Sequence, residues 1–147
     1  LGSTYRLQIV DQASQDLLLK GGMFRLRRSA LPEARAQFVA FYREKAKLRL
    51  PVLMAEYAGK VGVEPAAIRV QELKSRWASC SADGTLNFHW RCMMAQLSSL
   101  VYIVVHELVH LRHPNHTPEF WHTVEKVLPE YQLAKGWLRL HGAGLGL

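Results

Sequence analysis

The residues best suited to chemistry lie in the stretch Val104-Val105-His106-Glu107-Leu108-Val109-His110-Leu111, inside an apolar run with helical spacing. Residues four apart on an α-helix differ by about 40° in direction and about 6 Å in rise, so His106 and His110 point to the same side. Two imidazole nitrogens placed in this way suit a zinc ion, which binds histidine at roughly 2.0–2.1 Å. Glu107 projects roughly 100° away from His106, beside the metal, where it can take a proton from zinc-bound water. The stretch therefore predicts the active helix of a zinc hydrolase.

The same pattern also arises by chance, and a histidine pair on a helix is often only hydrogen-bonded surface. Here the flanking positions are Val or Leu, so the helix is expected to be buried. Burying an ionisable glutamate in such a helix costs stability, so its presence there indicates a functional role. The metal interpretation is therefore favoured over chance.

A catalytic zinc usually keeps three protein ligands and leaves one position for water, so the pattern needs a third ligand. His113 would lie about 10 Å from His106 along a continuing helix, and three ligands on one rod converge badly on a tetrahedral centre. His116 follows the turn expected at Pro114, so the chain can bring it back over the metal. The spacing favours His116, and the candidates that remain open beside it are His113, Glu119 and Glu125. The other late histidines, His122 and His141, are expected on the surface.

The first part of the chain predicts short strands followed by a long helix. Residues 4–28 alternate between apolar and polar positions in short runs. A helix is predicted from Leu31-Pro32-Glu33 to about Lys60, because Pro stands at an early position and an acid in the first turn. Pro51 cannot continue the hydrogen-bond ladder without a kink, so we expect a break near Leu50.

Two further strands are expected before the active helix. One covers Ile68 to about Leu73, and the other, Thr85 to Trp90, alternates cleanly between apolar and polar residues. Between them, residues 74–84 predict a loop rich in small polar side chains. If the second strand lies at the sheet edge beside the active helix, its free backbone groups can pair with an extended peptide. His89, on its polar face, is a candidate auxiliary site residue.

The ends of the last helices are marked by caps and prolines. Ser98 or Ser99 is a suitable N-cap for the active helix, and Pro114 ends that helix. Thr117-Pro118-Glu119 starts the next helix, with Thr as the cap and Pro at the first position. The tail, residues 142–147, is expected to be frayed.

Bulk composition indicates a globular protein. The chain has 147 residues, of which 49% are hydrophobic, and fits one domain over residues 1–147. The N-terminus lacks the charged start and apolar run of a signal peptide, and no stretch reaches transmembrane length. It also lacks an initiator Met, so we expect an N-terminally truncated fragment. Cys80 and Cys92 are too few for a disulfide scaffold, which makes a cytoplasmic, reduced setting the default expectation and small buried residues their expected role.

The chain is basic, with a formal net charge of +7. A basic face can bind nucleic acid or an acidic substrate, or it can serve solubility alone. No nucleic-acid motif accompanies the charge, so contact with nucleic acid through this face is a minor alternative. Much of the excess precedes the active helix, in Arg25, Arg27, Arg28, Arg35, Arg43, Lys45, Lys47 and Arg49.

Several short motifs occur together along the chain: Trp77-Ala78-Ser79-Cys80-Ser81, Gly84 to Arg91, Tyr102 to Leu111, Asn115-His116 and Phe120-Trp121. With them the chain resembles the YgjP-like metallopeptidases, predicted metal-dependent hydrolases related to the SprT-like and WLM peptidases. The resemblance covers most of the chain and is far more specific than the His-Glu-x-x-His pattern alone. Ala78 stands where the family usually has Gly, and His89 stands where Asn is usual. Family members also tend to carry extra N-terminal strands, which agrees with a truncated chain.

The resemblance implies an α+β fold of the minimal zincin type: a twisted, mostly antiparallel sheet whose edge strand precedes the active helix, with flanking helices. It implies one zinc ion on His106, His110 and His116, with Glu107 as the general base. The expected activity is hydrolysis of peptide bonds in a peptide or protein substrate, with no part for a membrane.

In the expected mechanism Glu107 takes a proton from zinc-bound water as the water attacks the peptide carbonyl, and passes it to the leaving amine. The sequence does not identify a further oxyanion donor, for which His89 and Tyr102 are the first candidates and Tyr131 and Arg91 the next. Two other functions compete with this one. One is a DNA-associated protease of the SprT-like kind, and the other is a non-catalytic module in which zinc only stabilises the fold.

Overall fold

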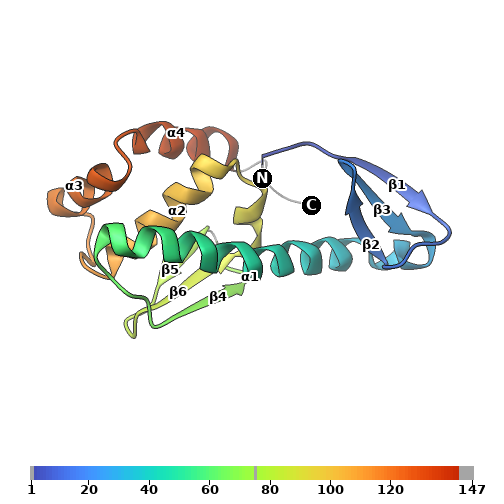
Figure 1. Ribbon diagram of the computed structural model, residues 1–147, viewed down its shortest axis with the longest axis horizontal. Helices are drawn as coiled ribbons and strands as arrows, with labels where there is room; N and C mark the ends of the chain where they lie inside the picture. Colours follow the sequence, from blue (N-terminus) through green and yellow to red (C-terminus); the bar gives the residue numbers. More distant parts are fainter. Residues whose placement is uncertain (1, 75, 143–147) are drawn as a thin grey trace.

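A computed structural model describes residues 2–74 and 76–142. It has an α+β fold, which confirms the expected class, with two small sheets placed along one long helix (Figure 1). In chain order the elements are β1 (Arg6–Val10), β2 (Leu17–Lys20), β3 (Met23–Arg27), the 3-10 helix η1 (Arg28–Glu33), α1 (Ala34–Val61), β4 (Ala67–Gln71), β5 (Ala78–Cys80), β6 (Thr85–His89), the 3-10 helix η2 (Trp90–Met94), α2 (Leu97–His110), α3 (Pro118–Val127) and α4 (Tyr131–His141).

The first sheet packs on the start of α1 and has the order β1-β3-β2. β1 runs parallel to β3, and β2 runs antiparallel to it. The apolar alternation of the central strand β3 explains its burial, because Phe24 and Leu26 face a small core of their own. Phe38 and Phe41 of α1 cover that core, with Phe24 meeting both rings edge-on at 5.1 and 5.0 Å between centroids.

Helix α1 is continuous from Ala34 to Val61, so the break expected near Leu50 is absent. Pro51 sits inside the helix on its exposed side, where the missing backbone donor costs least. Leu50 and Leu53 on either side of it are buried in the main core, and their packing holds the helix through the proline. The helix ends where the sequence predicts, because Gly62 adopts a left-handed φ of 83° and its N–H donates to the Ala58 carbonyl at 2.8 Å.

The second sheet has the order β4-β6-β5, which differs from the expected arrangement. The strand at 85–89 is central rather than at the edge, and the edge beside the active helix is the short strand β5. β4 pairs with β6 in parallel and β5 pairs with it antiparallel, so this sheet, like the first, is mixed rather than mostly antiparallel. The central place also buries the polar face of β6, where the Asn87 amide donates to the hydroxyls of Ser79 and Ser81 at 3.3 and 3.0 Å.

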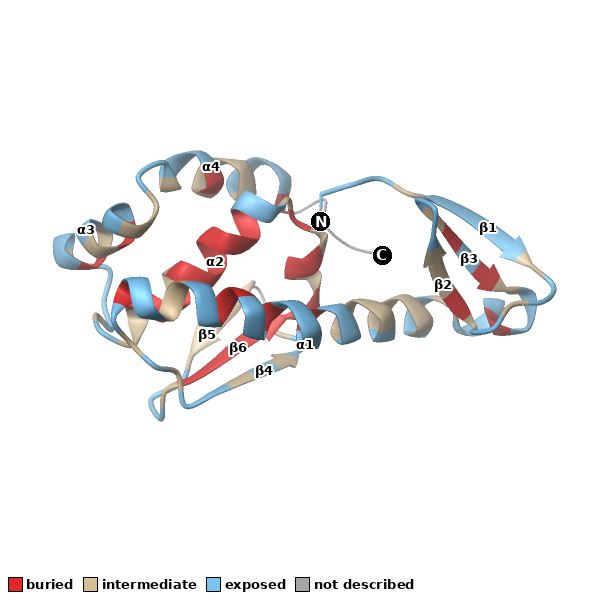
Figure 2. Cartoon of the chain, viewed as in Figure 1, coloured by how far each residue is buried: buried red, intermediate tan, exposed pale blue. Residues whose placement is uncertain are grey.

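The main core lies between this sheet, α1 and the active helix α2 (Figure 2). α2 is buried along most of its length, as its run of Val, Leu and Ile predicts. Its N-cap is Gln96 rather than Ser98 or Ser99, and Ser99 is buried within the first turn. Within the ranges 2–74 and 76–142, every helix is too short or too polar to span a bilayer.

Candidate active site

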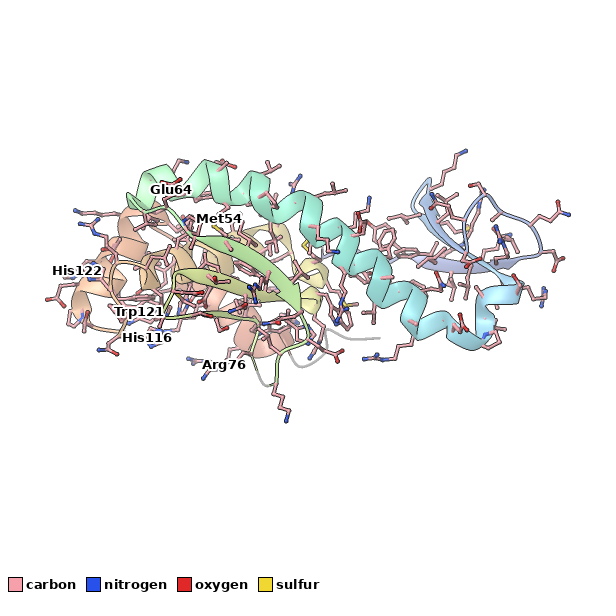
Figure 3. The ribbon with its side chains drawn as sticks, turned by 90° about the horizontal axis from the view of Figure 1, so that it is seen from below. Met54, Glu64, Arg76, His116, Trp121 and His122 are labelled. Atoms are coloured by element: carbon pink, nitrogen blue, oxygen red, sulfur yellow. The ribbon has the colours of Figure 1, made fainter. Side chains whose placement is uncertain are left out.

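Three histidines converge beside the last two turns of α2. His106 and His110 come from the helix, and His116 comes from the loop that joins α2 to α3. One ring nitrogen from each lies within 4.8 Å of the others. Figure 3 shows His116 and Trp121 near each other, at the opposite end of the molecule from the first sheet. The geometry therefore brings together the three histidines that the sequence favours.

The second ring nitrogens of the helical pair have partners that fix their orientation. His106 Nδ1 lies 3.1 Å from Glu107 Oε1, and His110 Nδ1 lies 3.3 Å from the His113 carbonyl oxygen. Since those acceptors take the Nδ1 proton, each Nε2 keeps its lone pair. The Nε2 atoms of His106 and His116 are 3.2 Å apart. Two nitrogens bound to one tetrahedral zinc stand roughly 3.3–3.4 Å apart, so this spacing fits shared coordination.

The loop that carries His116 is shaped by local hydrogen bonds. The Thr117 N–H donates to the Asn115 carbonyl at 2.8 Å, which turns the chain after the helix. Thr117 then caps α3 by accepting from the Phe120 N–H at 3.4 Å, as its place before Pro118 predicts. Phe120 is fully buried, and its ring centroid lies 4.9 Å from that of His116.

Two of the three histidines, His110 and His116, have lowered pKa values. The pKa of His110 is lowered by burial and then by the neighbouring His106. The pKa of His116 is lowered by burial and then by His106 and His110. A neutral imidazole is the form that binds a metal ion, so these directions agree with a ligand set.

Glu107 is buried, with 7% of its side chain exposed. Its Oε1 faces His106, and its Oε2 is buried without a hydrogen-bond partner among the described residues. An unpartnered buried carboxylate oxygen is unfavourable in a fold that only needs stability. Its place beside the three histidines suits a group that accepts a proton from a bound reactant.

A cavity of about 850 Å³ opens over the histidines. One wall is the segment from Arg76 to Gly84, which includes β5, and the other is α2 with the start of the following loop. Cys80 lines this wall and is half-buried, whereas Cys92 is fully buried as expected. Burial first, and then the carboxylate of Glu107, raises the pKa of the Cys80 thiol. The thiol therefore stays protonated, and it lies outside the histidine cluster.

The other sequence candidates fall into different places. Glu119 and Glu125 are exposed and His113 offers a backbone carbonyl, and none of the three belongs to the cluster of described residues that could hold a metal. His89 is buried, accepts from the Arg91 N–H at 3.0 Å, and does not line the cavity over the histidines.

Tyr102 does lie close to the histidines, one turn before His106, with ring centroids 5.8 Å apart. Burial raises its pKa to about 12, so the phenol remains a hydrogen-bond donor. Trp121, whose ring stacks on His116, was not predicted as a site residue. Its signal in the sequence was the Phe120-Trp121 motif that contributes to the family resemblance.

With the geometry established, comparison with known proteins decides the family. The model of the YgjP-like, metallopeptidase domain family matches residues 1–141. The chain belongs to this family. It is therefore a metallopeptidase, and its family implies a metal ion that the three histidines could hold. No curated protein matches the chain at a significant level.

Two solved structures of metallopeptidase zymogens are similar to the chain. The zymogen of Pyrococcus abyssi abylysin has 25% sequence identity and a TM-score of 0.57, and the match covers 64% of this chain and 93% of that one. The zymogen of Methanocaldococcus jannaschii jannalysin has 20% identity and a TM-score of 0.54, and the match covers 64% of this chain and 95% of that one. The second match supports the fold alone.

Proposed function

We propose that this metallopeptidase hydrolyses peptide bonds with one zinc ion held by His106, His110 and His116 and with Glu107 as its general base. The observation that supports the proposal most is the convergence of three histidine nitrogens within 4.8 Å beside a buried glutamate. Three neutral imidazoles are a usual ligand set for catalytic zinc, which leaves one position open for the reaction.

A zinc ion there would lower the pKa of water and polarise the substrate carbonyl. Glu107, which lines the cavity over the histidines, accepts a proton as the water attacks. It then donates that proton to the leaving nitrogen, so the peptide bond breaks and the carboxylate returns to its charged form. His106 keeps Glu107 in place through its Nδ1 contact with Oε1.

The short strand β5 offers a place for the substrate backbone. It pairs with β6 on one side, and in the described part of the chain no strand pairs with its other side. Ala78 and Cys80 of β5 both line the cavity over the histidines. An extended peptide that pairs with this free edge would lie across the proposed metal position.

A smaller cavity of about 260 Å³ adjoins the reacting groups and would receive one substrate side chain. It shares His106 and Glu107 with the larger cavity, and its floor is buried Ile103 of α2. Trp77 and Leu138 supply apolar walls. Pockets for drug-sized ligands run to roughly 300–1,000 Å³, so this one fits a single large apolar side chain next to the cleaved bond.

The competing functions have less support. A DNA-associated protease rests on positive charge alone, and part of that charge is paired, since Arg27 and Arg28 contact Asp16 and Asp11 at 3.1 and 2.7 Å. A purely structural zinc would favour four protein ligands, and the described residues bring three together.

The direct test replaces Glu107 with Gln, which is nearly the same size and cannot accept the proton. Zinc-loaded wild-type protein should cleave a mixture of denatured protein substrates, and a chelator should stop it. The Glu107→Gln variant should keep its zinc and lose activity by about 10²–10⁴-fold. The exposed His122→Ala variant serves as the control with unchanged activity. Turnover retained in Glu107→Gln would contradict the assigned role.

A further inference from the structure

A second cavity, of about 610 Å³, lies between the first sheet and the part of the chain that carries the histidines. It is lined by the segment before β1, by α1, by the end of η2 and by α4. Its lining shares no described residue with the cavity over the histidines. The mechanism proposed above does not use it.

The lining of this second cavity is mostly apolar. Phe24 and Phe41 contribute aromatic surface from the first sheet and α1, and Trp137 contributes it from α4. Leu48 and Val52 of α1 also face it, and these two aliphatic side chains are 64% and 61% exposed. Aliphatic surface left open inside a concave, aromatic-lined space is typical of a ligand site.

Two cations stand among these apolar residues. Lys45 and Arg49 are four residues apart on α1, so they project from the same side of the helix into the lining. None of the ion pairs among the described residues involves Lys45 or Arg49. The described lining of the cavity contains no acidic residue. The Lys45 ammonium lies over the Phe41 ring, 5.4 Å from its centroid, so a cation–π contact holds it against the aromatic surface.

The segment before β1 closes one side of the space. The Gly2 N–H donates to the Met94 carbonyl at 3.3 Å, and the Tyr5 ring meets the Phe24 ring edge-on at 5.5 Å. Gly2 has a φ of 68°, and a Cβ there would come within 2.8 Å of Gln96 Cα. Only glycine allows this close approach without strain, so the wall is a built feature of the fold.

We propose that this cavity binds a small amphipathic anion, whose apolar body packs on the rings and aliphatic side chains and whose carboxylate or phosphate head is bound by Lys45 and Arg49. The volume falls within the roughly 300–1,000 Å³ of small-molecule sites. Charge-assisted hydrogen bonds from the two cations would orient the head, and burial of the apolar body would supply most of the affinity. The site is independent of the metal.

The test uses isothermal titration calorimetry on the full chain at low salt, with decanoate and decyl phosphate below their micellar concentrations. Decanol, which has the same apolar body and no charge, is the control ligand. Decanoate or decyl phosphate should bind with one site per chain and about tenfold more tightly than decanol. The ratio between the two anions distinguishes a carboxylate head from a phosphate head.

Two sets of variants locate the site. Lys45→Gln with Arg49→Gln should reduce anion affinity to that of decanol, whereas Lys20→Gln with Lys47→Gln, at exposed positions outside the lining, should leave it unchanged. Val52→Trp should fill the cavity and abolish binding. Ala55→Trp, at an exposed position of the same helix, is its control.

Circular dichroism first establishes which variants are folded, so that a loss of binding can be distinguished from a loss of structure. Loss of the anion preference in the double variant supports the site even if Val52→Trp fails to fold. Equal binding of decanol and the anions by the wild type, anion binding unaffected by the double variant, or absence of binding for all three ligands would overturn the proposal.

Discussion

The imidazole of His116 stacks on the indole of Trp121, with ring centroids 5.7 Å apart and planes at 22°. Trp121 stacks in turn on Tyr131 of α4 at 5.4 Å, and the Lys135 ammonium lies 4.1 Å from its ring centroid. The most exposed of the three histidines is therefore positioned by side chains of two helices that follow it. A loop histidine held in this way loses less freedom when it binds a metal.

Replacing Trp121 should weaken metal binding without removing a ligand. Residues that orient metal ligands typically contribute 10–100-fold in affinity, so Trp121→Ala should lower zinc affinity by about that factor. Trp121→Phe, which keeps an aromatic face, should lose less. Competition titration with a chromophoric chelator measures both, and His122→Ala is the neighbouring control. Unchanged affinity in Trp121→Ala would show that the stack has no positioning role.

Filling the small cavity beside Glu107 should change substrate preference. Leu138→Trp narrows that cavity, so kcat/KM for peptides with a large apolar residue next to the cleaved bond should fall by about 10–200-fold relative to peptides with Ala there. Leu133→Trp, on the same helix and 71% exposed, should leave the ratio unchanged. Equal losses for both peptide types in Leu138→Trp would show that the cavity does not select the side chain.

His89 should make stability depend on pH. Burial first, and then the positive charge of Arg91, lowers its pKa in the folded protein. Because the unfolded chain binds a proton more readily, the stability from neutral His89 is present above its unfolded pKa of about 6.5 and is lost as pH falls below it. His89→Asn keeps an acceptor for the Arg91 N–H and removes the titration. Urea unfolding at pH 7.5 and 5.5 should show a smaller loss of stability in the variant, and an equal loss would contradict this assignment.

Pro51 should lower the free energy of unfolding, because it lies inside α1. A proline inside a helix costs about 3 kcal/mol relative to Ala, and Pro51 lies at an exposed position of α1. Pro51→Ala should therefore raise the free energy of unfolding by about 1–3 kcal/mol. Gly59→Ala, also exposed in α1, should add only about 0.5–1 kcal/mol. An unchanged or lower free energy of unfolding in Pro51→Ala would show that Pro51 does not destabilise α1.

The sequence predicted the active helix well because local signals there agree. His106, Glu107 and His110 share one helix, so their relative placement follows from helical geometry alone. Pro114 and Thr117-Pro118 predict the turn and the restart that return His116 to the same place, and both features are present. The α+β class was implied by the resemblance to the YgjP-like metallopeptidases, and the structure confirms it.

Features that depend on distant contacts were not predictable in the same way. β5 is three residues long and consists of Ala, Ser and Cys, so it carries no strand signal, and only its pairing with β6 makes it the edge. The continuity of α1 through Pro51 depends on packing in the core, which local propensity does not contain. The stacking of Trp121 on His116 likewise requires the return of α3 and α4.

The zinc content of the purified chain is a direct test of the three-histidine site, when it is determined by plasma mass spectrometry beside His116→Ala and His122→Ala variants. We expect close to one zinc per chain in the wild type and in His122→Ala, with a sharp loss in His116→Ala. Tight zinc retained without His116 would contradict the three-histidine site, and absence of zinc in all three proteins after zinc is supplied would contradict the metal centre itself.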